Sequence, residues 1–153
     1  MREYRPDDGP AVEQCLAELQ DFSKLLNPYD ADGSIAPQYL QHLLARCDET
    51  NGKIFVVESD GRVVGMVCVY AIVKANKLEE EYEYGYVSDL VVLAEHRGKG
   101  LGRALLKLAE NYAQQQGATL LRISVLAKNE VARKLYIDEG FDELVVTLQK
   151  RPG

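Results

Sequence analysis

The sequence predicts a mixed α/β (α+β) fold, in which a central, mostly antiparallel sheet carries helices on both faces. Strand-like segments alternate with amphipathic helical segments along the chain. The pair Asp60-Gly61 is a strong hairpin signal between two strand segments. A later strand, glycine-rich turn, helix and strand form a β-α-β crossover, which should be right-handed. The expected order is β-α-α-β-β-β-α-β-α-β, in one domain spanning residues 1–153.

The N-terminal third is expected to contain one strand and two helices. Asp and Pro within residues 6–10 are typical of a helix start. A stretch rich in Asn, Asp and Gly then breaks the helical pattern before Pro37 opens the second helix. The expected segments are a strand at 2–5, a helix to about Leu26, a loop at 27–34 and a helix from Pro37 to the stop at Asn51-Gly52.

The rest of the chain is expected to supply most of the sheet, because β-branched and aromatic residues dominate its strand segments. The clearest helix follows the glycine-rich turn, where Leu101, Leu105 and Leu108 recur at helical spacing before Gly117. The expected strands are Ile54–Val57, Val63–Val73, Tyr84–Leu93, Leu120–Leu126 and Phe141–Gln149, with a short helix at Asn129–Asp138.

Composition argues against several classes of protein. Apolar residues make up 46% of the chain and charged residues 27%, which is typical of a soluble globular protein. The net charge of -6 argues against nucleic-acid binding, because that function needs a basic surface. The three cysteines contain no CxxC pair, so we expect neither a disulfide framework nor a metal site. We find no signal peptide and no apolar run near ~20 residues, so we expect a cytoplasmic protein that does not act at membranes.

The run Arg97-Gly98-Lys99-Gly100-Leu101-Gly102 lies between a strand and a helix. The first amide N–H groups of a helix lack intrahelical partners, and the helix dipole adds partial positive charge there. Glycines let an anion approach these amides closely, so a diphosphate would fit. The run matches neither the P-loop pattern GxxxxGK[ST] nor the dinucleotide pattern GxGxxG. The alternative is an ordinary glycine-rich turn that binds nothing.

Two landmarks carry a resemblance to a known family. The first is Arg97-x-x-Gly100-x-Gly102 after the strand end Leu90-Val91-Val92. The second is Asn-Glu-Val-Ala-Arg-Lys-Leu-Tyr at 129–136, followed by Glu-Gly-Phe at 139–141. In this order they resemble the GNAT superfamily of N-acetyltransferases, over roughly residues 53–145. The resemblance implies an enzyme that transfers acetyl from acetyl-CoA to a primary amine by direct attack in a ternary complex.

The resemblance also implies where acetyl-CoA, the expected cosubstrate, binds. The strand before the loop would pair with the pantetheine arm, a bulge in it would open a slot, and a backbone N–H near Val92 would polarise the thioester carbonyl. Asn129 would contact the pantetheine arm; as an alternative or in addition, it caps the short helix. The expected coenzyme-binding residues are Leu90, Val91, Val92, Arg97, Gly98, Lys99, Gly100, Leu101, Gly102, Arg103 and Asn129.

Tyr136 and Asp89 are the expected catalytic residues. Tyr136 matches the family's frequent general acid, and a phenol is protonated at neutral pH; the alternative is core packing. The attacking amine must lose a proton, and Asp89 is the carboxylate in the central part of the strand before the loop. Some relatives carry Glu where this chain has Ser88. Asp89 therefore remains open as a direct base, as a holder of the amine or a water, or as a solvated strand residue.

The acceptor is the least determined feature. Acidic and tyrosine residues gather at 29–32 and 79–84, which suits a small cationic amine, although a solubilising surface explains most of them as well. A protein N-terminus also remains open as the acceptor. An acyl-CoA-binding sensor without turnover and a nucleotide-binding module are the alternative functions. The edge of the last expected strand needs cover, for which a homodimer is the commonest solution.

Overall fold

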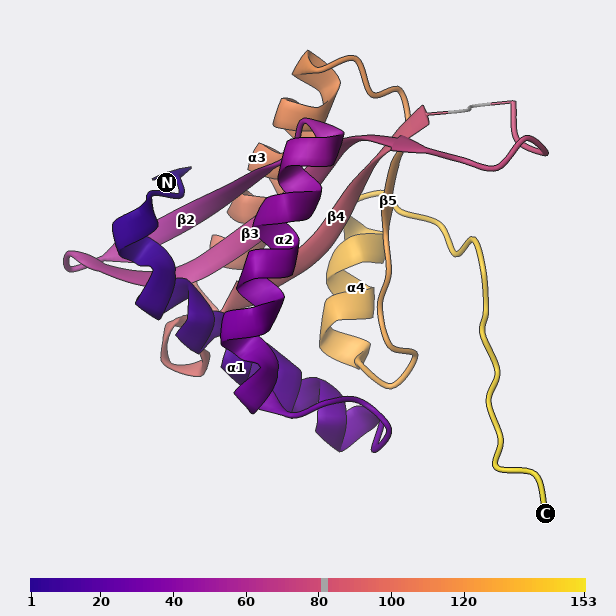
Figure 1. The fold of residues 1–153 in the computed structure, drawn as a ribbon, viewed down its shortest axis with the longest axis horizontal. Helices are drawn as coiled ribbons and strands as arrows, with labels where there is room; N and C mark the ends of the chain where they lie inside the picture. Colours follow the sequence, from indigo (N-terminus) through magenta and orange to yellow (C-terminus); the bar gives the residue numbers. More distant parts are fainter. Residues whose placement is uncertain (81–82) are drawn as a thin grey trace.

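The computed structural model describes residues 1–80 and 83–153 (Figure 1). Its strands are β1 (Arg2–Glu3), β2 (Lys53–Ser59), β3 (Arg62–Lys74), β4 (Glu83–Val92) and β5 (Leu121–Ile123). Its α-helices are α1 (Gly9–Leu26), α2 (Ala36–Thr50), α3 (Leu101–Gln115) and α4 (Glu130–Asp138). Every predicted helix is present, with small shifts at the ends.

The strands form one sheet in the sequential order β1-β2-β3-β4-β5. Neighbours from β1 to β4 are antiparallel, whereas β5 runs parallel to β4. The hairpin between β2 and β3 turns at Asp60 and Gly61, whose φ angles of 52° and 74° are left-handed, as the favoured two-residue turn requires. Helix α3 provides the crossover between β4 and β5. The predicted mixed, mostly antiparallel sheet is confirmed.

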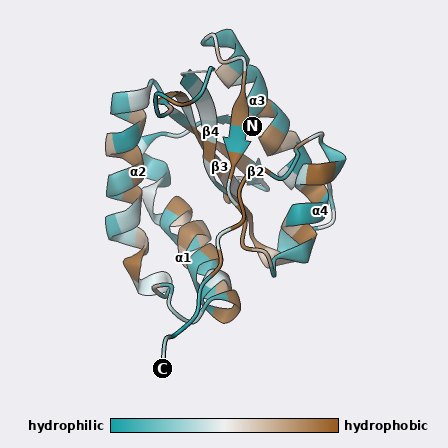
Figure 2. Ribbon diagram, turned by 90° about the vertical axis from the view of Figure 1, so that its right-hand side faces the viewer, coloured by the Kyte–Doolittle hydropathy of each residue, from teal (hydrophilic) through white to brown (hydrophobic). Residues whose placement is uncertain are grey.

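Helices cover both faces of the sheet, as predicted (Figure 2). Helices α1 and α2 bury Leu16 and Leu43 in one core, and α3 buries Leu105 and Leu106 in the other, with α4 beside it. Strands β2, β3 and β4 each contribute to both cores, because successive side chains of a strand point to opposite faces. Within the described ranges, none of the helices has the length and apolar character needed to cross a bilayer.

A bulge in β4 shapes the centre of the sheet. Val87 and Asp89 pair with consecutive residues of β3, so Ser88 between them is an extra residue. Strand β5 pairs only with residues 85–87 of β4. The ladder between β4 and β5 therefore ends where the bulge begins, while β4 itself continues to Val92. A bulge bends a strand and re-aims its side chains, and here it parts β4 from β5.

The predicted last strand, Phe141–Gln149, is wrong. This segment pairs with no other strand in the described part of the chain, and it extends beyond α4 without joining the sheet (Figure 1). Its apolar side chains beyond Phe141 are 67–88% exposed: Leu144, Val145, Val146 and Leu148. An alternating apolar pattern is not enough to form a strand, because a strand is stable only when its backbone pairs with a neighbouring strand. Strand β5, which offers the open edge, is also shorter than predicted.

Candidate active site

Asp89 lies immediately after the bulge, on the face of the sheet that α1 and α2 cover. The phenol of Tyr39, on α2, donates a hydrogen bond to Asp89 Oδ2 at 2.8 Å. The two residues are 50 positions apart in the sequence, so this contact exists only because α2 packs on the sheet. The hydrogen bond fixes the direction in which the carboxylate points.

Burial controls the protonation of Asp89. Desolvation raises the pKa of its carboxyl group from the ordinary 3.8 to about 6, and hydrogen bonds from Tyr39 and Ser88 limit that rise. A general base works best when its pKa lies near the operating pH. Asp89 is therefore not a solvated strand residue, one of the three roles that the sequence left open.

Further tyrosines line the same face of the sheet. Tyr70 of β3 is 6% exposed and stacks on Tyr86 of β4, with ring centroids 6.2 Å apart. The hydroxyl of Tyr86 donates to Ser124 Oγ at 2.7 Å, which ties β4 to the segment after β5. Together with Tyr39, these rings give the surroundings of Asp89 an aromatic wall, which attracts cations through the negative faces of the rings.

Tyr136 belongs to the opposite core and is 9% exposed. Its ring packs edge-on against Phe141, with centroids 6.0 Å apart, so its predicted core-packing alternative is present. Its hydroxyl has no hydrogen-bond partner within residues 1–80 and 83–153. Burial, with a smaller contribution from the charge of Asp89, raises the pKa of this phenol to about 12. Tyr136 is thus a protonated phenol that interacts electrostatically with Asp89 from the other side of the sheet.

The glycine-rich loop has the backbone of an anion cradle. Gly98 and Gly100 have φ angles of 80° and 79°, in the left-handed region that favours glycine. A Cβ atom added at either position would meet nothing within 4 Å, so the backbone is open to a ligand there. Gly100 is the N-cap of α3, whose first amide N–H groups point out of the helix without intrahelical partners.

The basic side chains of the loop are mostly engaged by carboxylates. Arg97 donates to the Val92 carbonyl oxygen at 2.9 Å and pairs with Glu18 of α1 at 3.1 Å. Arg103 pairs with Glu139. Lys99 is exposed and has no ion-pair partner among the described residues. The arginines therefore brace the loop, and Lys99 and the amides are the groups left to meet an anion.

The remaining predicted coenzyme residues sit around the opening between β4 and β5. Leu90 and Val92 pack into the core under α3 and α4, whereas Val91 points into the core under α1 and α2. These side chains are core residues, so any contact with a ligand would come from their backbone. Asn129 Oδ1 accepts a hydrogen bond from the Ala132 amide at 3.2 Å, so it does cap α4.

A match to a protein family decides the class of this protein. The profile of the acetyltransferase (GNAT) family matches residues 18–141, which include the loop, Asp89 and Tyr136. The chain belongs to this family. It is therefore an N-acetyltransferase, an acyl-transferring enzyme, as the two sequence landmarks predicted.

Individual relatives agree with this assignment. An uncharacterized N-acetyltransferase, YhfO of Bacillus subtilis, is 27% identical over 94% of this chain and 89% of its own length. The thialysine N-epsilon-acetyltransferase of Mus musculus is 26% identical over 94% of this chain and 84% of its own. The aminoalkylphosphonate N-acetyltransferase of Salmonella typhimurium is 34% identical over 55% of this chain and 53% of its own.

A solved structure shows the same fold. The GCN5-related N-acetyltransferase of Ralstonia eutropha is 18% identical to this chain, with a TM-score of 0.75 over 99% of this chain and 97% of its own. Within the described residues of this acetyltransferase, no group of three or more His, Cys, Asp or Glu side chains lies close enough to hold a metal ion.

Several carboxylates of the acidic segments that were predicted to bind the acceptor already have partners within the chain. Glu79 pairs with Arg122 of β5 at 2.8 Å, and the Arg122 guanidinium lies 4.4 Å from the Tyr84 ring. Asp30 and Asp32 accept hydrogen bonds from Asn27 and Ser34 of their own loop. The predicted residues at 81 and 82 lie outside the described part. The structural explanation thus accounts for these carboxylates better than substrate binding does.

Sequence reasoning missed Tyr39, Tyr70 and Ser124. Tyr39 lies within the helix expected from Pro37 onward, and Tyr70 lies within the expected strand Val63–Val73. No local signal marks them, because each reaches the site through a contact with a distant segment. The aromatic character of these two positions within apolar segments was the sole available hint.

Proposed function

We propose that this acetyltransferase transfers the acetyl group of acetyl-CoA to a primary amine by direct attack in a ternary complex. One observation carries the proposal. Where β4 parts from β5, the half-buried carboxylate of Asp89 faces one side of the sheet and a protonated phenol, Tyr136, lies on the other. A proton acceptor and a proton donor on opposite sides of an opening are what amine attack on a thioester requires.

Acetyl-CoA fits the residues around the opening. The left-handed glycines, the free amides at the start of α3 and exposed Lys99 suit the diphosphate of the coenzyme. The backbone of residues 90–92 has no β5 partner on its outer side, so it is free to pair with the amide-containing pantetheine arm. When bound, the cosubstrate supplies the acetyl thioester.

The protein groups then have separate tasks. Asp89 takes the proton of the acceptor ammonium, directly or through a water, and Tyr39 holds the carboxylate in position. A backbone N–H near Val92 stabilises negative charge on the thioester oxygen. Tyr136 donates its proton to the departing thiolate, and the raised pKa of this phenol keeps the proton available at neutral pH.

The acceptor we propose is a small cationic primary amine, with a protein N-terminus as the alternative. The half-buried carboxylate and the tyrosine wall formed by Tyr39, Tyr70 and Tyr86 suit an ammonium group. Relatives named for aminoalkylphosphonate and thialysine support a small amine. All residues of the proposed reaction come from this chain, which we take as a single transferase domain of residues 1–153 acting in the cytoplasm.

The test is a panel of amines incubated with acetyl-CoA and analysed for acetylated product by mass spectrometry. The panel contains aminoalkylphosphonates, thialysine, lysine, polyamines, an aminoglycoside and a peptide with a free N-terminus. We expect transfer to at least one small amine, and a loss of about 10²-fold in kcat for Tyr136→Phe, which keeps the ring packed on Phe141. Thermal protection by coenzyme A without any product would favour the acyl-CoA sensor, and protection by ATP or NAD instead would favour the nucleotide-binding module.

We further infer that the enzyme is a homodimer whose subunits contact each other through residues 142–149. The exposed side chains Leu144, Val146 and Leu148 alternate along an extended segment. Contiguous exposed apolar surface of this kind is typical of an interface. The segment ends beside the C-terminal end of α1, where Gln149 donates to Asn27 at 3.2 Å. We choose a second copy of this chain as the partner, because two copies can pair their open strand edges symmetrically.

A further inference from the structure

Two cysteines face each other across the interface between α2 and the sheet. Cys47, near the end of α2, and Cys68, in the middle of β3, have sulfur atoms 3.7 Å apart. Both are free thiols and both are buried, at 8% and 0% exposure. No sequence pattern predicts that they pair, because they are 21 residues apart and lie in different elements.

The backbones are also close at this point. Gly52 follows α2, and a Cβ atom added there would lie 2.6 Å from the Val69 carbonyl oxygen and 3.1 Å from the Cα atom of Cys47. Glycine thus lets the end of α2 rest directly against β3. A disulfide needs an S–S distance of about 2 Å and Cα atoms within about 7 Å. The sulfur atoms must therefore approach by about 1.7 Å, a movement that side-chain rotation and a small shift of α2 provide.

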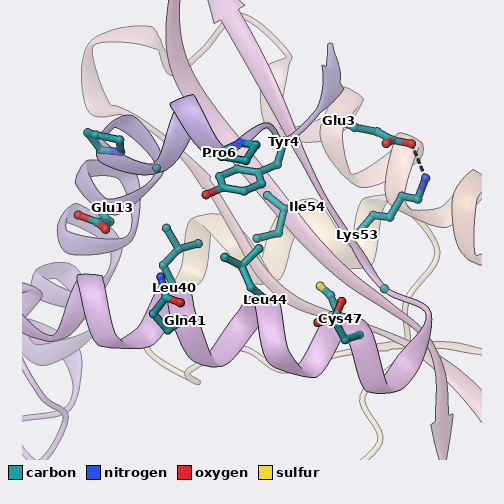
Figure 3. A pocket seen from close by; sticks show the side chains of 14 residues that line it. Glu3, Tyr4, Pro6, Glu13, Leu40, Gln41, Leu44, Cys47, Lys53 and Ile54 are labelled. Atoms are coloured by element: carbon teal, nitrogen blue, oxygen red, sulfur yellow. Dashed lines mark hydrogen bonds and ion pairs between the residues drawn. The ribbon is translucent and has the colours of Figure 1, made fainter.

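One of the two thiols is open to small reagents. Cys47 lines a surface pocket of about 770 Å³ between α2 and the first strands, together with Tyr4, Leu44, Lys53 and Ile54 (Figure 3). Figure 3 shows its sulfur pointing from α2 toward the strands. None of the predicted catalytic or coenzyme-binding residues lines this pocket. The pocket is therefore separate from the predicted active site.

The two thiols differ in reactivity. A hydrogen bond from Cys68 stabilises the Cys47 thiolate and lowers the pKa of Cys47. The same contact and burial raise the pKa of Cys68 well above its ordinary value. A thiolate is the form that attacks peroxides and disulfides. Because Cys47 is also the thiol that lines the pocket, it is the attacking thiol, and Cys68 is the neighbour that resolves the product.

We propose that Cys47 and Cys68 form a reversible disulfide when the protein meets a hydroperoxide. The Cys47 thiolate attacks one peroxide oxygen and breaks the O–O bond, which gives a sulfenic acid and releases water from hydrogen peroxide. The Cys68 sulfur then attacks the Cys47 sulfur, the S–O bond breaks, and a second water leaves. In sum, two thiols and one hydrogen peroxide give one disulfide and two waters.

The disulfide acts on the acceptor side of the site, a consequence that rests on the proposed function. Cys68 is the cross-strand partner of Asp89. Tyr39, which holds the Asp89 carboxylate, lies on the same helix as Cys47. Drawing α2 toward β3 therefore shifts both groups that position the base. Misplacement of about 1 Å costs on the order of 10²-fold in rate, so we expect the oxidised enzyme to transfer acetyl at least about tenfold more slowly.

Thiol counting tests the disulfide without any substrate. The protein is treated with hydrogen peroxide, freed of peroxide, denatured and alkylated with N-ethylmaleimide, and its mass is measured. Of the three thiols, wild type should carry one label after oxidation and three after dithiothreitol. The matched control Cys15→Ser, which removes the buried thiol outside the pair, should carry none and two. Cys47→Ser should carry two labels in both states.

Three labels on peroxide-treated wild type would overturn the proposal, as would an equal loss of labels in Cys47→Ser. Peptide mapping of oxidised wild type gives the same decision if a variant does not fold, since it must identify a 47–68 linkage. Acetyl transfer is then compared between oxidised and reduced wild type, and equal rates would overturn the effect on the site. Absence of turnover in the reduced enzyme would contradict the proposed function, while the thiol count would still test the disulfide.

Discussion

At the scale of single residues, the charged carboxylate of Asp89 costs the fold stability, and its proposed role explains why it is there. Its carboxyl group is desolvated on the packed face of the sheet, and the hydrogen bond from Tyr39 compensates only part of that loss. A stable protein has no need of a carboxylate held near pKa 6. Strongly shifted groups gather at functional sites because catalysis needs them there.

Asp89→Asn should stabilise the fold at neutral pH and abolish transfer. The pKa of Asp89 is about 6 in the folded protein and near 3.8 when unfolded, so the folded state binds more protons between these values and loses stability as pH rises through them. The neutral amide avoids this loss, a gain of at most about 3 kcal/mol above pH 6. Chemical denaturation at pH 4 and pH 8 measures it: the gain should be present at pH 8 and nearly absent at pH 4. An equal gain at both pH values would contradict a half-buried, titrating Asp89.

Tyr39→Phe should move the acid limb of the pH–rate profile upward. The phenol stabilises the Asp89 carboxylate, so its removal raises the pKa of Asp89. Activity that needs the carboxylate is lost as pH falls through that pKa, and the midpoint should rise by about one pH unit. The pH dependence of kcat/KM measures the shift. Tyr112→Phe is the matched control, because it removes a phenol that donates to the Asn51 carbonyl oxygen at 2.7 Å, away from the site; its profile should not move.

At the scale of elements, the loop and the bulge create an opening in a continuous sheet. The bulge at Ser88 ends the ladder with β5 but leaves β4 long enough to reach the glycine-rich loop. The loop in turn begins α3 with its free amides beside that opening. Each feature concerns the backbone, so side-chain substitutions at Leu90 to Val92 should affect packing more than binding.

Gly100→Ala should weaken coenzyme A binding more than it weakens the fold. Alanine at a φ of 79° is strained by roughly 1–2 kcal/mol, and its methyl group occupies the space in which a diphosphate approaches. Gly61→Ala is the matched control, since its φ is 74° and an added Cβ likewise meets nothing within 4 Å. Both variants should lose similar stability in denaturant. Only Gly100→Ala should lose affinity for coenzyme A, by at least about tenfold in calorimetry; equal affinity in the two would remove the loop from the binding site.

At the scale of the whole molecule, one apolar segment has no neighbouring strand within the described chain. Residues 142–149 leave α4 fully extended, although their sequence alternates like that of a strand. The rest of the molecule buries its apolar strands between two helical layers. The homodimer proposed above would cover this segment and complete the sheet edge.

Light scattering should therefore give about twice the monomer mass of 17.1 kDa for wild type. Lysine at both Leu144 and Leu148, which are 67% and 88% exposed, should yield a monomer, because charge is costly in an apolar interface. Leu78→Lys is the control, since this leucine is 94% exposed outside the segment; it should stay dimeric. A monomeric wild type at micromolar concentration would exclude the homodimer.

The fold class, all four helices, the hairpin and the family could be predicted from the amino-acid sequence alone. These features are local: helical periodicity, turn chemistry and the Arg97 to Gly102 loop depend on neighbours along the chain. The last strand failed for the complementary reason, since residues 141–149 show the pattern but have no neighbouring strand to pair with in the described chain.

Only the tertiary structure decided which groups surround Asp89. The hydrogen bond from Tyr39, the stacking of Tyr70 on Tyr86, and the approach of Cys47 to Cys68 all join residues from different elements. Likewise, the pKa of Asp89 is raised because α2 packs over it, and this burial cannot be read from the sequence of β4. Protonation and reactivity depend on the three-dimensional distribution of charge and solvent, and that distribution arises only when the helices pack on the sheet.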